Sequence, residues 1–167
     1  PEFVPDYVVE PKIDGVSISL HYVDGVLHQA VTRGDGEYGD DITTNVRTLK
    51  DIPLRLTCPG TPPRHLEVRG EAYMREADRI ALNEKLRARG DKTFANTRNA
   101  TAGSLKQLDP RIVAERPLRA VLYAIGYAEG ISFASHTEEL DALKAYGLSV
   151  PGVIRRAASI AEAEALA

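Results

Sequence analysis

The rest of the chain is best understood from the segment Val8-Val9-Glu10-Pro11-Lys12-Ile13-Asp14-Gly15. This segment has the pattern of a strand that runs into a turn. Because side chains two apart share one face of an extended backbone, we expect Glu10, Lys12 and Asp14 on the same side. The alternate residues would point toward a core. Gly15 allows a sharp turn or the close approach of a ligand.

A lysine between two carboxylates on a strand has two interpretations. Lys12 can be a covalent nucleophile, or it can be a surface cation in an ionic ladder between strands. An amine attacks only when it is deprotonated, and burial or nearby cations favour that form. Glu10 and Asp14 would do the opposite, so a nucleophilic Lys12 requires positive partners from elsewhere.

Composition limits the classes of protein that fit. The 167 residues suggest one domain or part of a larger one, and 43% hydrophobic with 27% charged residues is typical of a soluble globular fold. We therefore expect a cytoplasmic protein without a membrane span. The net charge of −3 argues against a dedicated nucleic-acid binder. The single cysteine, Cys58, excludes an intrachain disulfide, and the four histidines show no metal-ligand spacing.

Hydrophobic periodicity, turn pairs and capping residues predict the order of elements. Strands are expected at 7–12, 16–22, 26–33, 52–56, 65–73 and 118–127, followed by a short extended piece at 150–155. A short helix that Asp40 or Asp41 caps is expected to run to about Leu49, and further helices are expected at 76–88, 98–108, 137–146 and 160–167. The near-continuous apolar run at 118–127 predicts a strand that is buried on both faces.

Two motifs follow predicted strands or lie within them. Arg33-Gly34-Asp35-Gly36 is either a plain turn or a loop that passes close to a nucleotide phosphate, with Arg33 supplying charge. In 67–71, the small Gly70 could leave room for a flat ligand, and Glu71 could accept hydrogen bonds from ribose hydroxyls. The alternative for 67–71 is an ionic ladder on a solvated sheet face.

The segment 94–106 is unusually rich in small residues and carries two cations, Arg98 and Lys106. If both are helical, they lie on neighbouring sides of the helix and could clamp phosphates. The alternative is a closely packed helix with two solvated cations. Tyr123, in the apolar strand, is either a core aromatic or a stacking platform for a base.

Taken in order, these stretches resemble the nucleotidyltransferase (adenylation) domain of bacterial NAD-dependent DNA ligases. Lys12-Ile13-Asp14-Gly15 matches the Lys-x-Asp-Gly nucleophile motif of that family, and Arg33-Gly34-Asp35-Gly36 and 67–71 match two further motifs. The run Arg98-Asn-Ala-x-Ala-Gly-Ser-Leu resembles a stretch peculiar to the NAD-using branch. Tyr123 matches the nucleotide-stacking aromatic. The resemblance covers nearly all of the chain.

The resemblance implies an α+β fold with antiparallel sheets flanked by helices, of the nucleotidyltransferase (ATP-grasp-like DNA ligase catalytic) type. It implies that Lys12 takes AMP from NAD with the help of Mg²⁺, and that the AMP then passes to the 5′-phosphate of a nick in duplex DNA. It assigns nucleotide-binding roles to Glu10 (adenine), Glu71 (ribose), Tyr123 (base), and Asp14, Gly15 and Arg33 (ribose and phosphate end). It assigns contacts with phosphate or the nick to Arg98 and Lys106, and a metal ligand to no residue.

The chain also departs from the family pattern. Lys106 stands where the family usually has arginine, so bidentate geometry would be lost while the charge remains. The later lysine-bearing motifs and the N-terminal region that grips the nicotinamide half do not appear, and both ends look cut. We therefore expect 1–167 to be a partial adenylation domain that does not seal nicks alone and adenylates itself poorly or not at all. The parent is expected to be a monomer.

Two alternatives remain open at this point. The first is an ATP-dependent ligase or another covalent nucleotidyltransferase, because these enzymes share Lys-x-Asp-Gly. The second is a non-catalytic nucleic-acid-binding module, against which the net negative charge counts.

Overall fold

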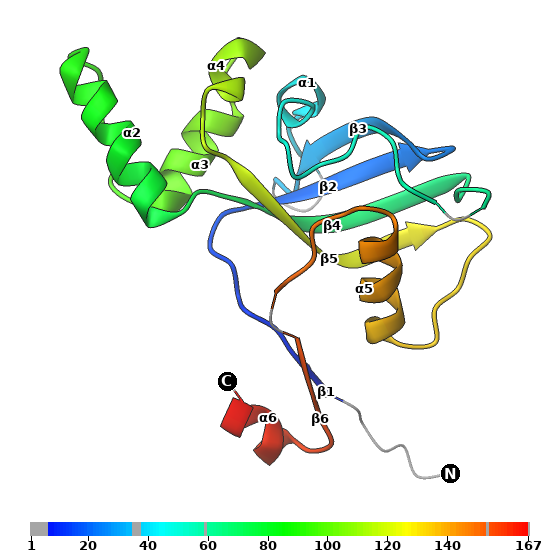
Figure 1. Cartoon of the computed structure of the whole chain (residues 1–167). Coiled ribbons are helices and arrows are strands. Elements are labelled where there is room, and N and C mark those ends of the chain that lie inside the picture. Colours follow the sequence, from blue (N-terminus) through cyan, green and yellow to red (C-terminus); the bar gives the residue numbers. More distant parts are fainter. Residues whose placement is uncertain (1–6, 35–37, 59, 153, 167) are drawn as a thin grey trace.

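A computed structural model describes residues 7–34, 38–58, 60–152 and 154–166 of the chain (Figure 1). Its elements are β1 (Tyr7–Val9), β2 (Val16–Val23), β3 (Val26–Thr32), α1 (Thr43–Val46), β4 (His65–Tyr73), α2 (Glu76–Ala88), α3 (Thr97–Leu105), α4 (Pro110–Ala114), β5 (Arg119–Ala128), α5 (His136–Ala145), β6 (Arg155–Ala157) and α6 (Ile160–Leu166).

The strands form two antiparallel sheets. Four strands pair in the order β3-β2-β4-β5, and β1 pairs with β6 in a separate two-stranded sheet. Asp24 (φ 48°) and Gly25 (φ 76°) connect β2 to β3 in the left-handed conformation that a two-residue hairpin requires. The strands predicted at 16–22 and 26–33 therefore form a hairpin, and the α+β class with antiparallel sheets is confirmed.

The two faces of the four-stranded sheet differ in character. Ile18, Leu20 and Tyr22 of β2 are almost fully buried, and Leu20 lies opposite the buried Val68 of β4 in the core. The alternate residues of β2 and β4 are polar and point to the other face, which we call the open face: Ser17, Ser19, His21, Glu67, Arg69 and Glu71. This alternation is the one that the sequence predicts for a half-buried antiparallel sheet.

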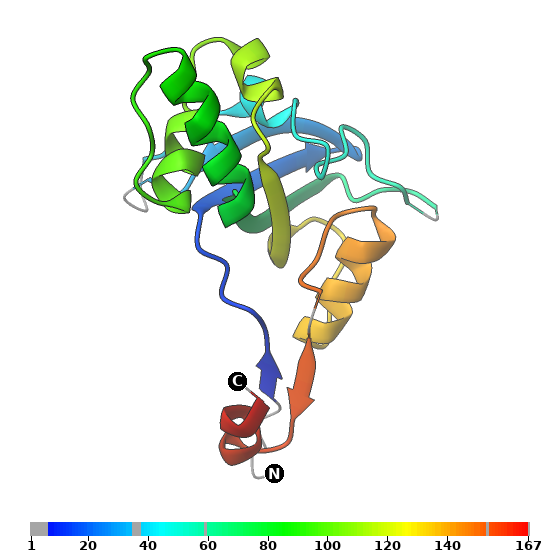
Figure 2. The same ribbon diagram turned by 60° about the vertical axis from the view of Figure 1, so that its left-hand side comes forward.

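The helices lie around the four-stranded sheet in distinct groups (Figure 1). α2, α3 and α4 gather at one end, α1 packs beside β3, and α5 packs beside β5. β1, β6 and α6 contact one another and form a small lobe that projects away from the sheet in both views (Figure 2). Segment 10–15 runs from this lobe to β2.

Three predicted strands differ in the structure. The first strand ends at Val9, so Lys12 lies in an irregular segment rather than on a strand. Segment 52–56 makes only an isolated bridge, between Arg55 and Val26, and forms no ladder. β5 is the edge strand of its sheet and is buried only at Ala120–Leu122, so burial on both faces along 118–127 was wrong.

The helix predictions were better for the longer helices. α2 spans the predicted residues, although its Ile80 is 49% exposed rather than part of the apolar stripe. Ser159 caps α6, accepting from the backbone N–H of Glu162 at 3.2 Å, and the last residue of the predicted helix, Ala167, lies outside the described residues. α4 was missed, although Asp109 and Pro110 are a typical capping residue and first helical residue.

The remaining helices differ mainly in their limits. α1 covers only Thr43–Val46 and ends before the predicted Leu49, and Asp41 accepts from the backbone N–H of Thr43 beside its start. α3 ends at Leu105 rather than at 108, and α5 is shifted by one residue to His136–Ala145. The extended piece expected at 150–155 becomes a strand only at Arg155–Ala157.

Candidate active site

Hydrogen bonds between strands order the side chains of the open face. Ser17 Oγ donates to Glu71 Oε2 at 2.9 Å, and Ser19 Oγ donates to Glu67 Oε1 at 2.9 Å. Arg69 Nε also donates to Glu67 Oε1, at 2.8 Å. Burial acts to raise the pKa of Glu67, but the hydrogen bonds from Arg69 and Ser19 outweigh it and lower the pKa. The face therefore carries ionised groups in fixed positions.

A cavity of about 630 Å³ lies over this face and is called the sheet-face cavity here. Its lining combines β2, β3, β4 and β5, and it includes Ser17, Ser19, His21, Thr32, Arg33, Glu67, Arg69 and Tyr123. Tyr123 is half-buried at this position, and burial followed by the nearby Glu71 carboxylate raises the pKa of its phenol. An aromatic ring beside carboxylates and an arginine can hold a planar, polar ligand.

A second hollow, the α3 groove, adjoins the sheet-face cavity. Its volume is about 590 Å³, and it shares Ser17, Thr32 and Arg33 with that cavity. Its other lining includes Gly15, Gly34, Arg98, Asn99 and Lys106. The structure thus brings Gly15, Arg33, Arg98 and Lys106 together along one groove, as phosphate binding would require.

Arg98 of α3 and Lys106, which follows α3, are each paired with an aspartate. Arg98 Nη1 lies 3.7 Å from Asp14 Oδ1, and Lys106 Nζ lies 2.5 Å from Asp40 Oδ2. All four side chains are more than half exposed, so each pair contributes little to stability. A phosphate could replace either carboxylate at small cost.

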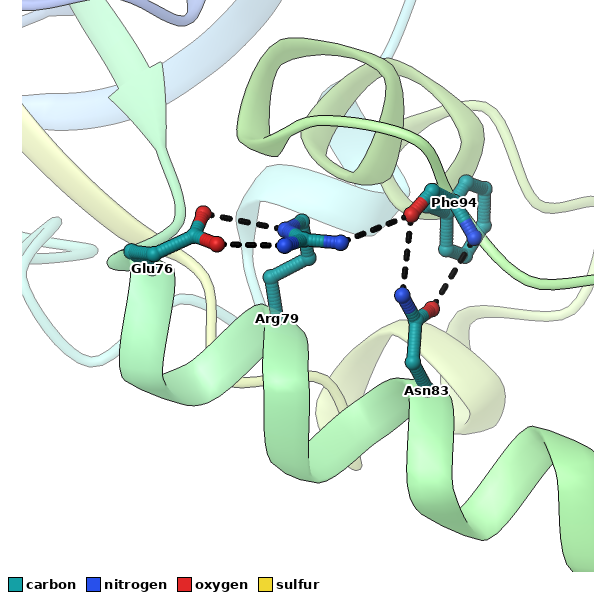
Figure 3. Close-up of polar contacts among 4 residues, drawn as sticks. All are labelled: Glu76, Arg79, Asn83 and Phe94. Atoms are coloured by element: carbon teal, nitrogen blue, oxygen red, sulfur yellow. Dashed lines mark hydrogen bonds and ion pairs between the residues drawn. The ribbon is translucent and has the colours of Figure 1, made fainter.

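The start of α3 is fixed by contacts with α2 (Figure 3). Asn83 makes two hydrogen bonds with the backbone of Phe94, donating to its carbonyl at 2.8 Å and accepting from its N–H at 2.9 Å. Arg79, itself paired with Glu76, donates to the same carbonyl at 2.9 Å. Asn96 then caps the helix by accepting from the N–H of Asn99. These contacts fix the position of the first turn of α3, which carries Arg98.

Two glycines of the predicted motifs are required by the backbone. A Cβ on Gly15 would collide with the carbonyl oxygen of Ala72, so the close approach at Gly15 is made by the chain itself. Gly34 has φ 56°, and a Cβ there would collide with the carbonyl oxygen of Tyr38. Asp35 and Gly36, the rest of that motif, lie outside the described residues.

Lys12 and Glu10 occupy the irregular segment between β1 and β2. Lys12 is exposed and is not among the residues that line the sheet-face cavity or the α3 groove. Glu10 Oε2 lies 3.3 Å from His136 Nε2 of α5. Glu10 Oε1 is buried and has no hydrogen-bond partner among the described residues. An unpaired buried acceptor of this kind is uncommon and is suited to a donor from a ligand.

The sequence of the chain is similar to that of a known protein family. A sequence profile of the NAD-dependent DNA ligase adenylation domain matches residues 2–167. The chain belongs to this family.

Curated relatives named DNA ligase agree with the family. The chain is 50% identical to the DNA ligase of Chloroflexus aurantiacus, over 97% of this chain and 24% of that protein. It is 55% identical to the DNA ligase of Magnetococcus marinus, over 87% of this chain and 19% of the relative. For that of Methylacidiphilum infernorum the identity is 54%, over 87% of this chain and 21% of the relative. The chain thus spans a quarter or less of the length of these relatives.

The structure gathers most, but not all, of the predicted site residues of this adenylation domain. Gly15, Arg33, Arg98, Lys106 and Tyr123 line the two adjoining hollows, and two further residues reach them through one contact each: Glu71 through Ser17, and Asp14 through Arg98. Glu10 contacts His136 of α5 instead. Lys12 is exposed and lines neither hollow.

The sequence analysis missed several residues of the site. Ser17 and Ser19 could have been found, because they alternate with core residues on the same strand face as Glu67 and Glu71. His136 could not, because no local pattern connects it with Glu10. Within the described residues there is no group of three or more His, Cys, Asp or Glu that could hold a metal ion, and no helix there is long and apolar enough to cross a bilayer.

Proposed function

We propose that this adenylation domain forms a lysyl-AMP intermediate on Lys12 from NAD, and that the whole protein uses it to seal nicks in duplex DNA. In the first step the Lys12 amine attacks the adenylyl phosphorus of NAD. A nitrogen–phosphorus bond forms, the bond to nicotinamide mononucleotide breaks, and the amine proton leaves to solvent. The AMP then passes to the 5′-phosphate of the nick, and the 3′-hydroxyl displaces it.

One observation carries the proposal: motif residues from 15 to 123 line two adjoining hollows on a single sheet face. In the proposed complex Tyr123 stacks on the base, Glu71 accepts from the ribose, and Arg33 faces the phosphates. Arg98 and Lys106 exchange their aspartate partners for phosphate oxygens of NAD or of the nick. Glu10 Oε1, which lacks a partner among the described residues, accepts from the adenine amine.

Magnesium is the expected cofactor of this reaction, where it supplies neutralisation of phosphate charge. The described residues offer no group of three His, Cys, Asp or Glu side chains that could hold a metal ion. Mg²⁺ usually keeps several waters and binds through substrate phosphates rather than a protein cage. The described residues therefore do not form a magnesium site, and we assign no step to it.

The test is the mass of the full-length protein after incubation with NAD and Mg²⁺. We expect a single AMP adduct on the wild type and on Lys92→Ala, an exposed lysine control, and none on Lys12→Ala. An adduct that persists in Lys12→Ala would refute the assignment. Labelling by ATP instead of NAD would favour another covalent nucleotidyltransferase. Absence of any adduct, with nick binding intact in Lys12→Ala, would favour a non-catalytic binding module.

The isolated chain 1–167 should behave differently from the full-length protein. Lys12 is exposed, with a carboxylate two residues away on either side, and this position supplies none of the burial that activates a lysine nucleophile. We expect little or no adduct on the isolated chain and no sealing of a nicked duplex. A robust AMP adduct on the isolated chain would contradict this part of the proposal.

A further inference from the structure

The ring of His136 lies between two carboxylates that come from different parts of the chain. Its Nε2 is 3.3 Å from Glu10 Oε2, and its Nδ1 is 3.3 Å from Glu139 Oε2. His136 begins α5, and Glu139 follows three residues later on the same side of that helix. Glu10 lies on the segment that leads to Lys12. Through this contact α5 holds the segment that carries the proposed nucleophile.

The two oxygens of Glu10 have different surroundings. Oε2 faces His136, whereas Oε1 is buried and unpaired within the described part of the chain. Buried polar atoms in proteins are nearly always hydrogen-bonded, and exceptions occur where a ligand supplies the partner. An ionised carboxylate can only accept, so the missing partner is an N–H or O–H donor.

We propose that His136 is a positioning residue that holds Glu10 Oε2, so that Oε1 reads the exocyclic amine of the purine base. The inference rests on the function proposed above, in which Glu10 faces adenine. Adenine presents an amine donor at its 6-position, whereas hypoxanthine and guanine present an oxygen acceptor there. An oxygen opposite Oε1 would leave two buried acceptors facing each other, so the site would reject an oxo-purine.

A structural role for His136 makes different predictions. If the contact only docks α5 on segment 10–15, its loss would lower stability and slow the reaction equally with every nucleotide. If His136 fixes the rotamer of Glu10, its loss frees a side chain with several torsions. The affinity for an amino-purine then falls, and the discrimination against an oxo-purine falls with it.

The experiment measures lysyl-AMP formation in the full-length protein, with NAD and with its hypoxanthine analogue. We expect His136→Ala to raise KM for NAD roughly tenfold, with little change in kcat, because a hydrogen bond to a charged group is lost. The preference for NAD over the analogue should fall by a similar factor. His136→Gln keeps an N–H that can donate to Glu10 and should restore most of both. His28→Ala, at an exposed histidine of β3, is the matched control and should behave as wild type.

Each outcome decides the proposal. A His136→Ala protein with the wild-type KM and the wild-type preference would overturn it. So would equal losses with both dinucleotides that His136→Gln fails to restore. If the wild type forms no adduct with NAD, the proposed function itself fails. An active wild type that is indifferent to His136 refutes only the positioning role.

Discussion

At the scale of single residues, the open face is held by pairings between neighbouring strands. Glu67 receives hydrogen bonds from both Ser19 and Arg69, and Glu71 receives one from Ser17. Each of these contacts fixes a carboxylate before any ligand arrives. A site of this kind binds with less loss of side-chain entropy than one that orders on binding.

The burial of His21, which lies beside His65, makes stability depend on pH. Their Nδ1 and Nε2 atoms are 3.2 Å apart, and burial lowers the pKa of His21, against the opposing charge of Glu67. In the unfolded chain the imidazole of His21 takes up a proton near pH 6.5. In the folded chain it takes up this proton only at lower pH. Stability from this group is therefore complete above about pH 6.5 and is lost as the pH falls below it.

Urea unfolding between pH 8 and pH 5 measures this effect. We expect His21→Gln to lose less stability than the wild type as the pH falls through 6.5 and below. The other groups near His21, namely His28, His65, Glu67 and Arg69, are common to both proteins, so the difference isolates His21. Parallel pH profiles for the two proteins would contradict the prediction.

Gly70 should tolerate no side chain. A Cβ there would collide with the carbonyl oxygen of Val121 and would lie 2.6 Å from Leu122 Cδ1 and 2.9 Å from Leu122 Cα. Because two of these atoms are backbone of the paired strand, relief requires the strands to separate. We expect Gly70→Ala to lower the free energy of unfolding by about 1–3 kcal/mol, as overpacking does.

Urea denaturation checks the Gly70 prediction, and Gly152→Ala is its control. A Cβ at Gly152 meets nothing within 4 Å. The control should change stability by less than about 0.5 kcal/mol, as most surface substitutions do. Equal stability of Gly70→Ala and Gly152→Ala would show that the β4–β5 pairing has room to spare.

At the scale of elements, the sequence predicted what local signals determine. The β2–β3 hairpin has the Asp24-Gly25 turn, and α2 has a periodic apolar stripe that Gly90 ends in the left-handed conformation. β1 is different, because its length depends on pairing with β6 at the far end of the chain. The predicted strand at 52–56 was wrong, because the segment makes one bridge and no ladder.

The link between α2 and α3 depends on one amide side chain. Asn83 is 4% exposed and makes both of its hydrogen bonds with the backbone of Phe94. Asn83→Ala leaves that carbonyl with the bond from Arg79 but leaves the N–H unpaired. We expect a loss of about 1–3 kcal/mol in the free energy of unfolding, and weaker nucleotide binding because α3 carries Arg98.

Thermal and urea unfolding, with NAD titration of the full-length protein, test the Asn83 prediction. Glu84→Ala is the control, because Glu84 is exposed on the same helix next to Asn83. If Asn83→Ala were as stable as Glu84→Ala, the two hydrogen bonds would contribute nothing net. If stability fell while NAD affinity stayed constant, the position of α3 would not depend on this contact.

At the scale of the whole molecule, the candidate site follows partly from the sequence. The motif residues of β2, β4 and β5 could be placed together, because antiparallel pairing brings alternate residues onto one face. The position of Lys12 could not, because it depends on how the β1–β6 lobe sits relative to the sheet. The contact between Glu10 and His136 is equally non-local, since it needs α5 to pack beside the segment that leaves β1.

The lobe should open at a lower free energy than the central sheet. Its strands pair over only three residues each, and none of the residues of α6, Ile160–Leu166, is buried. A two-stranded sheet is marginal by itself in water, whereas β4 is paired on both sides and contains fully buried residues. We expect amides of 7–9 and 155–157 to exchange with solvent deuterium at least roughly a hundredfold faster than those of 66–72.

Native-state hydrogen exchange in a urea series distinguishes local from global opening of the lobe. If the lobe opens alone, its exchange rates stay nearly constant at low urea, while those of β4 rise with global unfolding. Equal protection of the lobe and β4, with the same urea dependence, would mean that the two unfold as one unit. Lys12 lies on the segment that joins them, so independent opening would let the proposed nucleophile move relative to the open face while Arg33 and Tyr123 stay in place.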